Sequence, residues 1–75
     1  MNIITISHTG ARHASQFTAN CIVFEAKSDM AGFVAVKVEA NGEYKTFAIY
    51  LNGDRVTATT NYPKAIGLAL LKLTE

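Results

Sequence analysis

The sequence predicts an α+β fold in which a small antiparallel sheet is covered on one face by a C-terminal helix. Two observations predict the sheet: residues 33–40 alternate valines with other side chains, and two Asn-Gly pairs divide residues 33–59 into a three-stranded meander. A third observation predicts the helix, because apolar residues recur at helical spacing over residues 62–74. The 75 residues are expected to form a single domain, 1–75.

The N-terminal part of the chain is expected to add one or two strands to the meander. Residues 2–6 are rich in β-branched side chains, and residues 20–26 hold a short apolar run between polar flanks. Residues 7–20 are polar and fit either a loop or a short helix from Ala11 to Ala19. The segment from Lys27 to Gly32 is expected to be a connection, because it contains Ser, Asp and Gly.

The two Asn-Gly pairs also predict how the strands align. Each pair favours a two-residue type I′ turn, because such a turn needs positive φ at both of its residues. A first turn at 41–42 places Val36 opposite Phe47, and a second turn at 52–53 places Ile49 opposite Val56. This alignment gathers apolar side chains on the face that the helix covers: Val34, Val36, Val38, Phe47, Ile49, Leu51, Val56 and Ala58.

The predicted helix starts near Pro63, whose fixed φ suits a first helical turn. Asn61 or Tyr62 would cap it. The side chains expected to face the sheet are Ile66, Ala69, Leu70 and Leu73, and those expected to point away are Leu68 and Leu71.

Composition excludes several classes of function. Seven basic against six acidic side chains give a net charge of +1, which is too small to attract phosphate strongly. The single cysteine cannot form an internal disulfide, and together with two histidines it does not make a common zinc site. No apolar run approaches the roughly twenty residues of a membrane span. We therefore expect a cytoplasmic protein that crosses no membrane and holds neither a metal nor a cofactor.

The sequence contains no set of residues typical of an active site. His8 and His13 are five positions apart, without a nearby carboxylate to orient either imidazole. A catalytic role for Cys21 beside a histidine is one hypothesis. A lone cysteine in an apolar run is, however, typical of a core position. The protein is therefore expected not to be an enzyme.

The outer face of the meander is the first candidate binding surface. The predicted alignment places Phe33 opposite Tyr50, Lys37 opposite Thr46 and Glu39 opposite Tyr44, with Arg55 beside Tyr50. Tyrosine and arginine are enriched where proteins bind each other. The alternative is that these cross-strand pairs only stabilise the sheet. The candidate partner-binding residues on this face are Phe33, Lys37, Tyr44, Tyr50 and Arg55. Leu68 and Leu71 of the helix are further candidates. These two leucines either form a partner or homodimer interface or lie under the N-terminal segment around Phe17.

The loop of residues 7–20 is the second candidate surface. Residues 1–24 contain no acidic side chain, so His8, Arg12 and His13 are candidates for contacting phosphate or an acidic partner. The alternative is a polar connection, since one arginine makes no basic patch.

Three antiparallel strands followed directly by a helix, over residues 33–73, are similar in order to double-stranded RNA-binding domains and to the small N-terminal DNA-binding domains of phage integrases. The similarity is one of topology. The helix start, Asn61-Tyr62-Pro63-Lys64, has one lysine where the RNA-binding domains are lysine-rich, and the outer sheet face offers Lys37 and Arg55 where integrase domains are basic. No functional residue carries over.

Two hypotheses follow from these observations. The first is a small non-enzymatic protein that binds a larger protein or complex as an inhibitor or regulator, as small phage and mobile-element proteins such as anti-CRISPR proteins do. The alternative is a nucleic-acid-binding module that uses the outer sheet face and the Arg12 loop.

Overall fold

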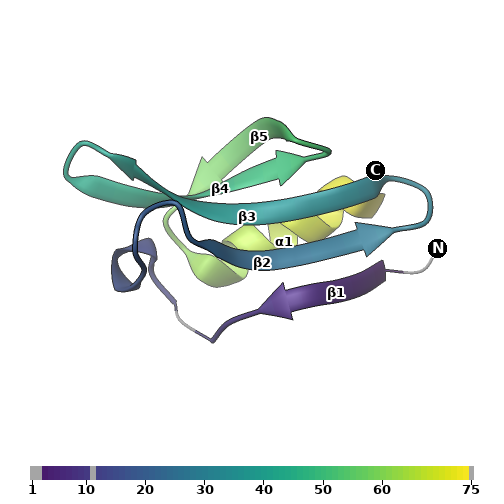
Figure 1. Cartoon of the computed structure of the whole chain (residues 1–75), viewed down its shortest axis with the longest axis horizontal. Coiled ribbons are helices and arrows are strands. Elements are labelled where there is room, and N and C mark those ends of the chain that lie inside the picture. Colours follow the sequence, from purple (N-terminus) through teal and green to yellow (C-terminus); the bar gives the residue numbers. More distant parts are fainter. Residues whose placement is uncertain (1–2, 11, 75) are drawn as a thin grey trace.

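The computed structural model describes residues 3–10 and 12–74 and shows a five-stranded antiparallel sheet with one C-terminal helix (Figure 1). The α+β prediction is therefore confirmed. The elements in chain order are β1 (Ile3–His8), the short 3-10 helix η1 (Ala14–Gln16), β2 (Ile22–Ser28), β3 (Gly32–Asn41), β4 (Tyr44–Leu51), β5 (Asp54–Thr59) and α1 (Tyr62–Thr74).

The strands lie in the sheet in the order in which they occur along the chain, from β1 to β5. The sheet is thus one continuous meander of five strands and not a three-stranded meander with separate additions. Helix α1 lies across one face and packs mainly against β3 and β4 (Figure 1). We call that side the covered face and the opposite side the open face. In the described part of the chain, no helix is long and apolar enough to cross a membrane.

The first hairpin has a different turn from the predicted one. Asn41 stays in the strand and pairs with Tyr44, so the turn residues are Gly42 and Glu43. Gly42 has a φ of 66°, whereas Glu43 is not among the residues with positive φ. A glycine at the first turn position alone is typical of a type II′ turn, and the predicted type I′ turn needs two such residues.

This change of turn moves the partner of each β3 residue by two positions. Val36 lies opposite Ile49, and Phe47 lies opposite Val38, so the predicted pairing of Val36 with Phe47 is wrong. Because side chains alternate with a period of two, a shift of two leaves every side chain on its predicted face. The prediction therefore placed the β3 and β4 residues on the correct faces in spite of the wrong register.

The second hairpin begins as predicted and then departs from the expected register. Both turn residues, Asn52 and Gly53, have positive φ, and Leu51 pairs with Asp54. After the next pair the register shifts, so that Ile49 lies opposite Thr57. A bulge of one residue at Val56 reverses the alternation. Val56 is 41% exposed, and Ala58 lies opposite Ala48, so the expected places of both on the covered face are wrong.

The core lies between the covered face and α1. The helix contributes Ala65, Ala69 and Leu73, which are fully buried, while Ile66 and Leu70 of the predicted stripe are only half-buried. The small alanine side chains allow the helix to approach the strands closely. The Asn61 side chain accepts a hydrogen bond of 2.9 Å from the Lys64 amide, which confirms Asn61 as the helix cap. The fully buried side chains of the strands in this core are Ala26, Val34, Val36, Val38, Phe47 and Ile49.

The segment between β1 and β2 is mostly loop. The alternative of a helix from Ala11 to Ala19 is wrong for the described residues, because only η1 is helical there and Ala11 itself lies outside them. Phe17 anchors the loop, with its ring 5.7 Å from that of Phe47 and 6.4 Å from that of Tyr62. The loop thus closes one end of the core.

The hydroxyl of Tyr62 joins the helix to the first two strands. It donates to the Val23 carbonyl (2.9 Å) and accepts from the Thr9 amide (3.2 Å). Val23 is the extra residue of a bulge in β2, so its carbonyl needs a partner other than the ladder. Nδ1 of His8 lies 3.0 Å from the same hydroxyl. The Tyr62 hydroxyl thus contacts three residues of the N-terminal half of the chain.

Candidate protein-interaction surface

Cross-strand pairing arranges the open-face side chains in rows. Side chains opposite each other on adjacent strands lie about 4.5–5.5 Å apart at Cβ and act as contact pairs. The first row is Ile4, Lys27 and Phe33; the second is Ser7, Glu25, Ala35, Tyr50 and Arg55; the third is Ile22, Lys37, Ala48 and Ala58.

A hollow of about 220 Å³ lies in the middle of these rows, and we call it the open-face hollow. Small side chains create it, because Ala35 and the neighbouring Ala48 are buried beneath longer residues. The lining is mostly apolar, with one charged group at its border. Its residues are Ile22, Phe33, Ala35, Lys37, Tyr50 and Gly53.

A network of polar contacts fixes one side of the open-face hollow. Nε of Arg55 donates to Oε1 of Glu39 at 3.0 Å, and the Tyr50 hydroxyl donates to Oε2 of the same carboxylate. Nζ of Lys37 lies 5.2 Å from the centroid of the Tyr50 ring. Tyr50 is therefore held at its hydroxyl and contacted on its ring by a cation.

These contacts shift the pKa values of two groups in opposite directions. The hydrogen bond from Tyr50 lowers the pKa of Glu39; partial burial opposes this effect and Arg55 adds to it. The carboxylate in turn raises the pKa of Tyr50. At neutral pH Glu39 is charged and Tyr50 is protonated, so the network is complete.

Both carboxylates of the open face accept hydrogen bonds within the chain, whereas its two lysines form no ion pair within the described residues. Glu25 accepts a hydrogen bond of 3.2 Å from the Ser7 hydroxyl, and Glu39 is bound by Arg55 and Tyr50. Within residues 3–10 and 12–74, neither Lys27 nor Lys37 contacts a carboxylate. The open face therefore carries one more positive than negative charge, and Lys37 lies at the border of the apolar hollow.

The structure gathers four of the predicted partner-binding residues on this face, with neighbours different from those expected. Phe33 lies opposite Lys27 and not Tyr50, because β2 and not β4 provides its partner. Lys37 lies opposite Ala48, so its predicted pairing with Thr46 is wrong. Tyr50 lies opposite Arg55 as expected. Phe33, Lys37 and Tyr50 line the open-face hollow, and Arg55 stands beside it through Glu39.

The remaining partner-binding candidates lie elsewhere. Tyr44 pairs with Asn41, not with Glu39, and is 72% exposed at the β3–β4 turn, where it lines a separate hollow. Leu68 packs partly against the core, so the expectation that it points away from the core is wrong. Leu71 is 52% exposed, as the helical pattern predicted. The ring contacts of Phe17 are with Tyr62, at the start of the helix, and with Phe47.

Of the three candidate phosphate contacts, His8 and His13 line different hollows. His8 packs against the rings of Phe24 and Tyr62 at 6.0 and 5.7 Å, and it lines a hollow together with Cys21. His13 lines the hollow of Tyr44 instead. Arg12 is exposed, and its backbone amide is bound by the Gln16 side chain.

Cys21 and His8 line one hollow of about 260 Å³, which is the arrangement that the catalytic hypothesis requires. Both residues also have contacts within the fold. Nδ1 of His8 is occupied by Tyr62, and Sγ of Cys21 lies 3.7 Å from the Ile22 carbonyl, with Cys21 packed partly against the core. No group of three or more His, Cys, Asp or Glu side chains in the described chain is arranged to hold a metal ion.

Sequence reasoning did not place Ile22 and Lys27 on the open face, and it put Ala35 on the outer side of its strand without naming it as a candidate. It assigned no partner strand to β3 on the side away from β4, and it placed Lys27 in a connection. The apolar run at residues 21–24 was the available signal, but the bulge at Val23 hides which of its side chains faces outward.

Comparisons with models of protein families, with curated proteins and with solved structures find no match to this chain.

Proposed function

We propose that this protein is a non-enzymatic binding module that acts on a larger protein or complex, as an inhibitor or regulator, through the open face of its sheet. One observation carries the proposal: an apolar hollow on the open face is bordered by Lys37, with Lys27 opposite its lining residue Phe33, and neither lysine forms an ion pair in the described chain. An anti-defence protein of a phage or mobile element is one form that such an inhibitor takes.

The chemistry of the hollow defines the partner. Its apolar lining favours an aliphatic or aromatic side chain, because burying apolar surface on both sides is the main source of affinity. Lys37 at the border and Lys27 opposite Phe33 favour carboxylates beside that side chain. The partner is therefore a protein segment in which an apolar residue is flanked by aspartate or glutamate.

The same contacts favour a protein over a nucleic acid. Base stacking needs a free aromatic face, whereas Lys37 already lies over the Tyr50 ring. Phosphate binding needs several free cations, whereas Arg55 is neutralised by Glu39. Two separate lysines are a weak basis for binding nucleic acid and a sufficient one for orienting an acidic peptide.

The test is a selection of random peptides on the immobilised full chain, followed by titration of the selected peptide. The expected sequences combine one apolar residue with neighbouring acidic residues. Lys37→Glu is expected to weaken binding about tenfold, or about 1.4 kcal/mol. Lys64→Glu is the matched control, because Lys64 is exposed on the helix and makes the same change of charge away from the open face.

Amide chemical shifts identify the surface that is used. Binding should perturb Phe33, Lys37 and Tyr50, and it should spare the exposed side of α1. Selected peptides without acidic residues, or equal effects of the two lysine substitutions, would refute the proposal. Salt-sensitive binding of DNA or RNA that Lys37→Glu abolishes would support the nucleic-acid alternative instead.

A further inference from the structure

The first strand of the sheet is unusually exposed for an edge strand. Ile3, Ile4 and Ile6 are 38%, 55% and 50% exposed, and β1 contains no aspartate, glutamate, lysine, arginine or proline. Edge strands of monomeric proteins usually carry such residues, because their unpaired backbone groups otherwise recruit another strand. The edge of β1 is therefore open to pairing.

Helix α1 does not shield this strand. It packs mainly against β3 and β4 and makes fewer contacts with β2 and β5. At the end of β1, His8 meets Tyr62 of the helix. Ile3 and Thr5 belong to the side of the sheet that faces the helix, yet both are exposed. The beginning of β1 is thus accessible on both faces as well as along its edge.

The opposite edge of the sheet is protected. Strand β5 begins with Asp54 and Arg55, and its bulge at Val56 interrupts the regular ladder. Charged residues and bulges both discourage pairing with another chain. Strand β1 also has a bulge, at Ile6, but Ile3–Thr5 is regular and uncharged, so unprotected pairing surface is concentrated at these three residues.

We propose that β1 pairs antiparallel with β1 of a second copy of this chain. Antiparallel pairing of identical strands is two-fold symmetric, so a single self-complementary surface serves both copies. The regular part of the strand, Ile3–Thr5, contains no titratable side chain, so like charges do not meet, and its isoleucines and threonine form favourable cross-strand pairs. A second copy of β1 thus provides apolar contacts for isoleucines that are exposed in a single chain.

The geometry of β1 fixes the register of this pairing. Ile6 is the extra residue of a bulge, so the regular part of the strand is Ile3–Thr5. Backbone groups point alternately toward and away from β2, and in each opposing pair both residues point either toward the new partner or away from it. Within the regular part, the pairing that meets this condition and uses all three residues places Ile4 opposite Ile4, with Ile3 opposite Thr5.

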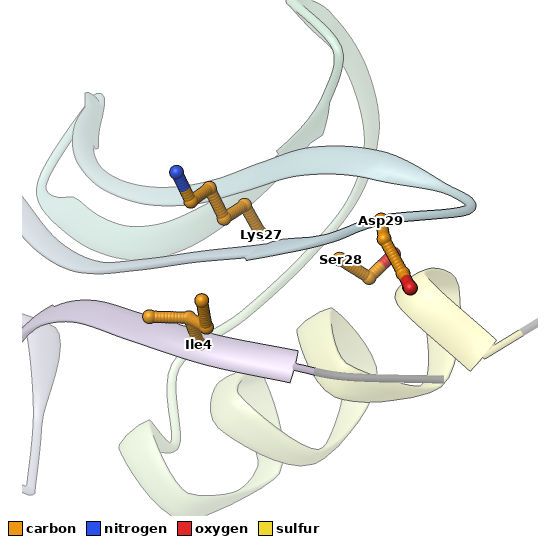
Figure 2. Close-up of a pocket in the computed structure, with 4 residues that line it drawn as sticks. All are labelled: Ile4, Lys27, Ser28 and Asp29. Atoms are coloured by element: carbon orange, nitrogen blue, oxygen red, sulfur yellow. The ribbon is translucent and has the colours of Figure 1, made fainter.

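The surface next to Ile4 has room for this contact. Ile4 borders a hollow of about 370 Å³ with Lys27, Ser28 and Asp29. Figure 2 shows the Ile4 and Lys27 side chains on neighbouring strands, both directed to the side away from the helix. In the dimer, the Ile4 side chains of the two copies would pack against each other beside this hollow. In a single chain the Ile4 side chain is exposed.

Sedimentation equilibrium of the full chain, from micromolar to millimolar concentration, tests the proposal. Wild type is expected to dimerise, and Ile4→Lys is expected to raise the dimer Kd at least about tenfold, because it sets two ammonium groups opposite each other. Val56→Lys is the matched control, since Val56 is a similarly exposed residue of the other edge strand. A wild type that stays monomeric at millimolar concentration, or equal effects of the two substitutions, would overturn the proposal.

A second measurement does not depend on the folding of the lysine variant. In a Cys21→Ser background, Ile4→Cys is expected to form an intermolecular disulfide under mild oxidation, because residues opposite each other have Cα atoms about 4.5–5.5 Å apart, within the range of about 4.4–6.8 Å that a disulfide spans. Val56→Cys in the same background should not cross-link. Cross-linking at Val56 as efficient as that at Ile4 would refute the β1 interface. Both measurements are independent of what the open face binds.

Discussion

The two faces of the sheet come from the same strands and differ in what their side chains contact. On the covered face, Val36, Phe47 and Ile49 are fully buried against α1. On the open face, Ala35 and Ala48 leave a hollow between Lys37 and Tyr50. The difference shows how a small chain separates stability from binding: one set of alternating positions builds the core, and the other set remains available for a partner.

The largest expected effect comes from truncating the centre of the covered face. Phe47 is fully buried, with ring centroids of Phe17 and Tyr62 at 5.7 and 5.3 Å. Phe47→Ala is expected to lower the free energy of unfolding by about 3–5 kcal/mol, measured by urea denaturation. Phe33→Ala on the open face is the control and should change it by less than about 1 kcal/mol. Similar losses for both variants would contradict the division between the faces.

The second effect concerns the hydroxyl that joins the helix to the strands. Tyr62→Phe keeps the ring in the core and removes the partner of the buried Val23 carbonyl, which is expected to cost about 1–3 kcal/mol. Tyr44→Phe is the control, because Tyr44 is exposed at a turn. Thermal and urea denaturation measure the difference. Equal stability of the two variants would show that the Tyr62 hydrogen bonds contribute nothing net.

Because the Tyr62 hydroxyl is buried, we also expect the fold to lose stability at alkaline pH. Burial raises the pKa of Tyr62 above its ordinary value, and the Thr9 amide opposes this effect. A folded-state pKa above the unfolded one means that the stabilisation is complete below the unfolded pKa of about 10 and is lost as pH rises through the folded-state value. The free energy of unfolding should therefore fall above about pH 10 more steeply in wild type than in Tyr62→Phe. Parallel curves would contradict this.

The third effect lies at the end of the sheet beside the open-face hollow. Gly32 has a φ of 100°, and a Cβ there would lie 2.9 Å from the amide carbon of Asn52, whose oxygen accepts from the Phe33 amide at 2.9 Å. Gly32→Ala is expected to destabilise the fold by about 1–2 kcal/mol. Gly10→Ala, with nothing within 4 Å of the added Cβ, is the control. Amide spectra should show the Gly32 change at Phe33 and Asn52.

The smallest effect is the ion pair on the open face. Glu39→Gln is expected to lower stability at neutral pH by less than about 1 kcal/mol, because the pair with Arg55 is partly exposed to solvent. The pKa of Glu39 is lowered in the folded state, so its contribution is present above the unfolded pKa of about 4.3 and disappears as pH falls through the folded-state value. Glu43→Gln at the turn is the control. A wild-type advantage that persists at pH 2 would exclude Glu39 as its source.

Sequence reasoning predicted the covered face better than the open face, for a geometric reason. The valines of β3 and the turn at Asn52-Gly53 follow local rules, and both were predicted correctly. A register error of two residues left the buried set unchanged, but it gave Lys37 and Glu39 the wrong neighbours. Binding surfaces depend on those neighbours.

The bulges were beyond local prediction. Strands β1, β2 and β5 each contain an extra residue, and each bulge reverses which side chains face outward. No turn dipeptide or change of composition marks Ile6, Val23 or Val56 in the sequence. The helical pattern likewise could not tell which side of α1 is buried most deeply. Ile66 and Leu70 fit that pattern as well as Ala65 and Ala69, and packing against the sheet buries the two alanines.

The Tyr62 hydroxyl has a consequence for the order of folding. It bonds residues 53 and 54 positions away along the chain, whereas the hairpins between β3, β4 and β5 close over short loops. Contacts between distant residues form late, because closing a long loop costs entropy before any contact repays it. Strand β1 should therefore dock last, after the helix has formed, and its amides should exchange with solvent sooner than those of β3. The strand that completes the sheet is then also the one that opens most readily.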